Sequence, residues 1–121
     1  MTLQQIGPDS LKSEINVLEI PLIIITPSVT QYTFANLQLD FNIVGIDVKT
    51  ATGTLDLKIK INSTDVVWTT TGNNIEVTNS PQDDDAASAN VFAVGDNLVF
   101  DVSNLGSTPT KLELTLHCVR T

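Results

Sequence analysis

The sequence predicts an all-β protein, a single-domain antiparallel β-sandwich of jelly-roll-like type with an extended N-terminal arm. Apolar and polar residues alternate in several windows, as expected for half-buried strands, and turn residues separate these windows. No window of ten or more residues has helical periodicity apart from weak turns near residues 9–14 and 83–89. Seven or eight short strands with this punctuation indicate a sandwich or a jelly roll.

The length of 121 residues suits one domain, which on folding buries about 65% of the surface of the unfolded chain. Residues 1–16 are expected to form an arm, because their apolar residues are scattered and a Gly-Pro pair interrupts regular structure. Residues 17–121 are expected to form the sandwich. The apolar residues of the arm, which would contact a neighbouring subunit or the chain's own domain, are Leu3, Ile6, Leu11 and Ile15.

The first strand is expected in "VLEIPLIIITP", residues 17–27. One face carries Leu18, Ile20, Leu22 and Ile24. Pro21 faces the other way and has no N–H to donate, so this strand should lie at the edge of a sheet or change partners near Pro21.

A second apolar register follows, in which Leu37, Leu39, Phe41 and Ile43 share a face. After Ile43 the register moves to Val44, Ile46 and Val48. A shift of one residue reverses every side chain, so the sequence predicts a bulge or bend around Val44 and Gly45.

The clearest alternation is in "GTLDLKIKINSTDVVW", residues 53–68, where one face carries Leu55, Leu57, Ile59 and Ile61. Its charged face should contact water or a neighbour, and a short strand should follow at residues 66–68. Residues 69–90 are predicted to be mostly loop, with one short strand at residues 75–77. Two closing strands have apolar faces made by Leu98, Phe100 and Val102, and by Leu112, Leu114, Leu116 and Cys118.

Charge and cysteine content exclude several classes of partner. Fourteen acidic and six basic residues give a formal net charge of −8, which opposes binding to nucleic acid or to anionic membranes. Cys118 is the single cysteine, so no intrachain disulfide and no cysteine-based metal cage can form, and a buried apolar role is expected. The start of the sequence does not resemble a secretory signal, which favours synthesis in a reducing cytoplasm.

Few residues offer catalytic or metal chemistry, so we expect no enzyme activity, no cofactor and no metal site. His117 is the single histidine, and the strand pattern makes it an exposed residue whose catalytic partners would have to come from distant loops. Asp83, Asp84 and Asp85 could bind a hard cation, but they lack the spacing of a calcium loop and are expected to keep an exposed loop solvated.

Trp68 and Tyr32 are the candidates for a glycan site or an interface, because aromatic side chains stack on sugars and anchor interfaces. A single tryptophan in an all-β protein is more often part of the core. Trp68 would support a carbohydrate site only if it were exposed beside the threonines at positions 69–71.

Three segments together resemble small β-sandwich structural proteins of tailed bacteriophages. They are "LKIKINSTDV", then "ASANVFAVGDNLVFDVSN", and then the closing "KLELTLHCVRT". Proteins of this family have a strand of the type I-x-I-N-G-T-x-V, a hairpin of the type N-x-V-A-V-G-D-x-L-x-L-x-V, and a closing strand ending in arginine and threonine. In this chain Ser63 replaces the frequent glycine. The resemblance covers about residues 17–121.

The resemblance implies a virion component, first of all a head decoration (cement) protein on the capsid exterior, made in the host bacterial cytoplasm. The partners it implies are the major capsid protein and the chain itself, as a homotrimer. We expect the apolar arm residues to dock on the capsid and the sandwich faces to form the trimer. The alternatives are a tail, neck or fibre module that binds a receptor or glycan and, third, an enzyme that depends on His117.

Overall fold

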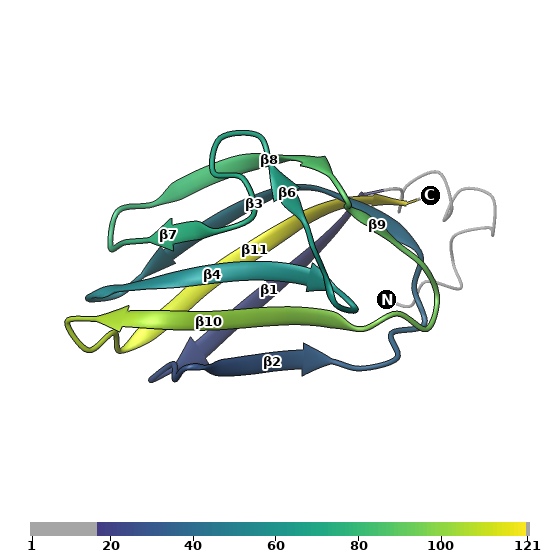
Figure 1. Ribbon diagram of the computed structural model, residues 1–121. Coiled ribbons are helices and arrows are strands. Elements are labelled where there is room, and N and C mark those ends of the chain that lie inside the picture. Colours follow the sequence, from purple (N-terminus) through teal and green to yellow (C-terminus); the bar gives the residue numbers. More distant parts are fainter. Residues whose placement is uncertain (1–16, 121) are drawn as a thin grey trace, which may run out of the picture.

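The computed structural model describes residues 17–120, which form two antiparallel sheets packed face to face (Figure 1). No helix occurs among these residues. The strands are β1 (Val17–Ile25), β2 (Thr30–Phe34), β3 (Phe41–Thr50), β4 (Thr54–Ile61), β5 (Thr64–Asp65), β6 (Val67–Trp68), β7 (Ile75–Val77), β8 (Gln82–Ser88), β9 (Val91–Phe92), β10 (Leu98–Gly106) and β11 (Lys111–Arg120).

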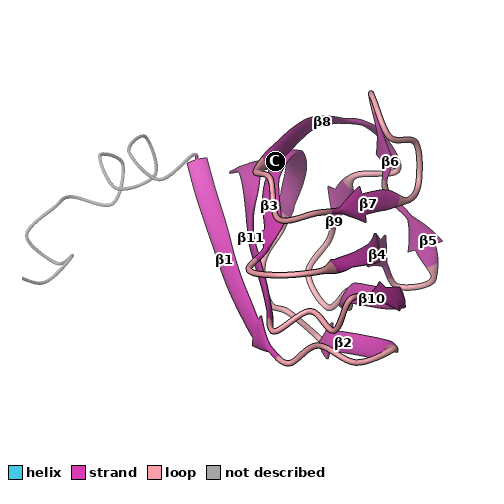
Figure 2. Ribbon diagram, turned by 90° about the vertical axis from the view of Figure 1, so that its left-hand side faces the viewer, coloured by secondary structure: helices cyan, strands magenta, loops and turns pink. Residues whose placement is uncertain are grey.

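The strand order is that of a jelly roll. One sheet, which we call sheet A, has the order β1-β11-β3-β8-β6, with β9 paired to β3. The other, sheet B, has the order β2-β10-β4-β5, with β7 paired to β4. Without the two-residue strands, four strands remain in each sheet, β1-β11-β3-β8 and β2-β10-β4-β7, and Figure 2 shows these two layers side by side. This arrangement confirms the predicted β-sandwich of jelly-roll type.

The core lies between the sheets and is made by the alternation visible in the sequence. Inward residues of β4 and β11, such as Leu57 and Leu116, have no exposed surface, because period-two geometry sends every second side chain to the same face. Two aromatic rings, Phe41 and Phe92, stack at 4.6 Å between ring centroids and complete one end of the core. The predicted apolar faces of β1, β4, β10 and β11 therefore all point inward. The apolar face of β1 is only partly buried.

The predicted irregularity at Val44 is present as a β-bulge. His117 of β11 pairs with Gly45 and the next residue, Cys118, pairs with Ile43, so Val44 has no partner on β11. The bulge allows Ile43 and Ile46 to be buried although they are three positions apart.

Two parts of the sequence reading are wrong. Residues 82–88 form strand β8 and not a loop or helical turn, because β3 supplies a pairing partner that local sequence could not reveal. Leu37 and Leu39 do not share the strand of Phe41. They lie in the connection before β3, where Leu37 packs against the core and Leu39 is exposed.

Candidate functional site

An apolar groove opens between the edge strands of the two sheets. Strand β1 ends where β2 begins, and the two strands diverge from this corner (Figure 1). Between them lies a groove of about 430 Å³ without a charged residue in its lining. We call it the apolar seam; it is lined by Leu22, Ile23, Ile24, Ile25, Tyr32, Thr33, Phe34 and Phe100.

The seam is a part of the core that sheet B leaves uncovered. The inward residues Leu18, Ile20 and Leu22 of β1 are only partly buried, whereas the facing positions of the neighbouring strand β11 are buried. At the mouth of the seam, Ile25 is 69% exposed and Phe34 is 39% exposed. Adjacent exposed apolar side chains of this kind mark interaction surfaces on soluble proteins.

The free edge of β1 cannot form an unbroken ladder of hydrogen bonds with an added strand. The Thr26 N–H donates to the Thr110 carbonyl at 2.8 Å, so alternation along an antiparallel pair turns the backbone groups of even-numbered β1 residues toward β11. The odd-numbered residues, Pro21 among them, then face the free edge. Proline lacks an N–H, so the row of edge donors is broken at its centre, and the predicted edge position of Pro21 is confirmed.

The two aromatic candidates have different positions. Trp68 is 1% exposed and lies in the core, so the prediction that Trp68 could be an exposed glycan or interface residue is wrong. Tyr32 lies in the seam, where its Oη accepts a hydrogen bond from the Ser28 N–H at 3.0 Å, and it remains a candidate interface residue. The arm residues Leu3, Ile6, Leu11 and Ile15 lie outside the described residues.

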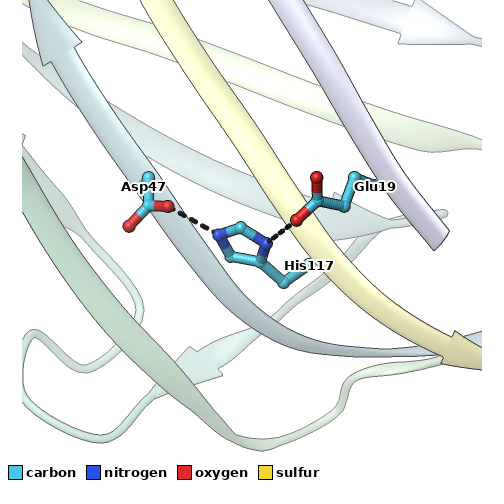
Figure 3. Close-up of polar contacts among 3 residues, drawn as sticks. All are labelled: Glu19, Asp47 and His117. Carbon is cyan, nitrogen blue, oxygen red and sulfur yellow. Dashed lines mark hydrogen bonds and ion pairs between the residues drawn. The ribbon is translucent and has the colours of Figure 1, made fainter. Parts of the chain in front are cut away.

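A charged cluster on the outer face of sheet A was not predicted. His117 of β11 lies between Glu19 of β1 and Asp47 of β3 (Figure 3). Its Nδ1 is 2.8 Å from Glu19 Oε2 and its Nε2 is 2.6 Å from Asp47 Oδ2. An ionised carboxylate only accepts hydrogen bonds, so both contacts are hydrogen bonds to ionised carboxylates only when both ring nitrogens donate, that is, in the imidazolium form of His117.

This His117 cluster links the three strands β1, β11 and β3. The hydrogen bond to Asp47, assisted by the one to Glu19 and by both negative charges, raises the pKa of His117 against the opposing effect of partial burial. Neither nitrogen is free to take a proton from a nucleophile, as a catalytic histidine must. The two carboxylates bind opposite ends of the ring, and no group of residues within 17–120 is arranged to hold a metal ion.

The three neighbouring aspartates do not converge on one point either. Consecutive strand residues alternate between faces, so Asp84 points away from the face of Asp83 and Asp85. Burial disfavours its charge, but hydrogen bonds from the backbone of Thr70 and from the hydroxyl and backbone of Thr71 outweigh this and lower the pKa of Asp84. Asp84 thereby fastens the loop after β6 to β8.

Residues from two of the three segments that carry the resemblance meet at one end of the sandwich. Asn62, in the turn between β4 and β5, donates from Nδ2 to Asp96 Oδ1 at 3.1 Å and accepts from the Asn97 N–H at 3.0 Å. Asp96 also accepts from the Ala93 N–H, and these two bonds lower its pKa. Asn62 adopts φ 58°, so the turn forms with Ser63 at the position of the frequent glycine. These residues hold loops together and have no visible reactive role.

Sequence reasoning could have placed Glu19, Asp47 and His117 on polar strand faces but could not have brought them together. His117 is 98 positions from Glu19 and 70 positions from Asp47 along the chain. The three residues meet only because the strand order is β1-β11-β3. The seam likewise depends on which strands end the two sheets. Its only local signal was Pro21.

Comparison with known proteins gives no relative from which a function could be transferred. Residues 17–120 contain no helix that is long and apolar enough to cross a membrane. No family model, no curated protein and no solved structure matches the chain.

Proposed function

We propose that the chain is a structural protein of a bacteriophage virion, a capsid decoration protein that binds and stabilises the shell of major capsid protein. The observation that carries the proposal is that the motif residues Asn62 and Asp96 join loops of a jelly roll that also has an open apolar seam. Jelly rolls occur in viral capsid and lectin domains, which supports the proposal at the level of the fold.

The proposed mechanism is binding through many weak contacts. The apolar arm residues within 1–16 dock on the capsid, and sandwich faces join three copies into a homotrimer. Each trimer then contacts several capsid subunits at once, so modest individual affinities combine into strong attachment. The net charge of −8 keeps the free protein soluble before it binds.

The arm can be tested with matched charge variants. Aspartate at the apolar positions Leu3, Ile6, Leu11 and Ile15 should abolish co-sedimentation with expanded phage shells, and removal of residues 1–16 should do the same. Aspartate at Gln4, Gln5, Ser10 and Ser13 adds the same charge at polar positions and should leave binding intact. Unchanged binding of the apolar-position variant would reject the arm as the docking element.

The copy number in purified particles separates the head from the other virion locations. Hundreds of copies per particle are expected for decoration, and a few to a few tens would indicate neck, tail or fibre. The second candidate is a fibre module that binds a receptor or glycan, and it is favoured by Tyr32 in an open groove. Glycan-array binding that is lost in Tyr32→Ala, together with absence from purified heads, would support this second candidate.

A further inference from the structure

At the apolar seam, one edge of the sandwich core is left uncovered. Strand β1 ends sheet A, and no strand within residues 17–120 lies beyond β2 in sheet B to cover the inward side chains of β1. The surface left open is uncharged and includes Leu22, Ile24 and Phe34. An occupant of the seam should therefore supply apolar side chains and little charge.

At least sixteen residues precede β1, the strand whose inner face is open. The stretch from Val17 back to Ile6 spans about 36 Å when extended, whereas the middle of the seam lies about 20 Å along β1 and about 10 Å across to the second sheet. Residues 1–16 contain four large aliphatic side chains but only two acidic residues and one basic residue. Their length and composition both match the seam.

We propose that in the free protein residues 1–16 of the same chain cover the apolar seam, with Ile6 and Leu11 packed against Phe34 and the inner face of β1. This inference does not depend on the proposed function, because it concerns the chain before any partner binds. If the chain does decorate shells, the arm leaves the seam when it docks on the capsid.

A second copy is a poorer occupant than the chain's own arm. Pro21 breaks the row of edge donors with which a second sheet would pair. The arm is also tethered to β1, which gives it an effective concentration in the millimolar range without any association step.

Disulfide trapping in the full-length chain tests the proposal. Leu11→Cys combined with Phe34→Cys should form an intrachain disulfide under mild oxidation at low protein concentration, as seen on non-reducing gels and by peptide mapping. The control combines Leu11→Cys with Glu76→Cys, an exposed position on β7 at the opposite edge of sheet B. The native Cys118 is buried and does not compete.

The seam pair should form the intrachain bond at least about tenfold faster than the control pair, because proximity raises the effective concentration of the two thiols. Equal rates, or no bond in the seam pair, would overturn the proposal. Disulfides between chains would overturn it in favour of a second copy as the occupant.

Oxidative footprinting provides a second test that leaves the seam residues unchanged. Ile6→Asp with Leu11→Asp should increase oxidation of Phe34 and Tyr32, while Thr2→Asp with Ser10→Asp should not. Equal oxidation in both variants would contradict the proposal. Both tests use the free chain, so their failure leaves the shell-binding result unaffected, and a failure to bind shells leaves them unaffected.

Discussion

At the scale of single residues, His117 is a titratable group whose protonated ring joins three strands. Glu19 faces it from β1 and Asp47 from β3. Asp85 of β8 lies on the same face, beyond Gly45, where an added Cβ would be 3.6 Å from the ring and 3.7 Å from the Asp85 carboxylate. The groups around His117 are therefore acidic, and they favour the imidazolium.

The pKa of His117 predicts a pH dependence of stability. Because the folded pKa lies above its ordinary value of 6.5, the stabilisation is fully present below about pH 6.5 and is lost as the pH rises through the folded pKa. In denaturant unfolding, His117→Gln should lose about 0.5–1 kcal/mol at pH 6 and much less at pH 9.5, since the pairs are partly exposed. An NMR titration of His117 measures the folded pKa directly.

The control for this prediction is Glu113→Gln, which removes a carboxylate from the same strand that does not contact His117. It should leave the His117 titration almost unchanged, whereas Asp47→Asn should lower the pKa of His117. A His117 pKa at or below 6.5 in the wild-type chain would contradict an imidazolium that donates hydrogen bonds to both Glu19 and Asp47.

Two glycines with similar backbone angles differ in their surroundings. Gly53 has φ 69°, and a Cβ there would lie 2.5 Å from the Gly106 carbonyl oxygen. Gly72 has φ 72° with no atom within 4 Å of such a Cβ. Gly72→Ala should therefore cost about 1 kcal/mol for the left-handed conformation alone, and Gly53→Ala about 3 kcal/mol because backbone must also move. Urea unfolding of both variants measures the difference, and equal losses would contradict the role of crowding.

At the scale of elements, β1 is held strongly on one edge and is open on the other. It pairs with β11 along all nine of its residues, from Val17 to Ile25. Its outer edge is exposed, as are Ile23 and Ile25. Pro21 is the feature that keeps this edge from acting as a template for another strand.

Replacement of Pro21 should increase self-association. Pro21→Val adds an edge N–H and a residue that favours strands, so sedimentation velocity should detect larger assemblies than those of the wild-type chain at equal concentration. Pro81→Val is the control, because Pro81 precedes β8 and lies outside the strands. Identical sedimentation of wild type and Pro21→Val would show that the proline does not protect the edge.

At the scale of the whole molecule, one core joins the two sheets. Cys118 of β11 has no exposed surface and belongs to that core. Burial raises the pKa of its thiol to about 12, so the thiol is both protonated and inaccessible at neutral pH. The buried apolar role expected for this cysteine is confirmed.

The reactivity of Cys118 should report global unfolding. In native buffer a thiol reagent such as DTNB should react at a rate limited by unfolding, and in denaturant it should react at once. Ser63→Cys in a Cys118→Ala background places a thiol in an exposed turn and should react rapidly in the native state. Rapid native reaction of Cys118 would contradict a closed core around β11.

The sequence by itself determined which side of each regular strand faces the core. Leu55 and Ile59 point inward as expected, because side-chain direction along a strand alternates locally whatever the neighbouring strand is. The bulge at Val44 and the edge position of Pro21 were readable for the same reason. Each follows from one or two adjacent residues.

Only the tertiary structure decided which strands are neighbours. The meeting of Glu19, Asp47 and His117, and the pairing of the acidic strand β8 with β3, depend on contacts between distant parts of the chain. The open seam depends on which two strands end their sheets. Pairing order results from the packing of the entire core, and a local pattern of alternation is the same whichever strand lies beside it.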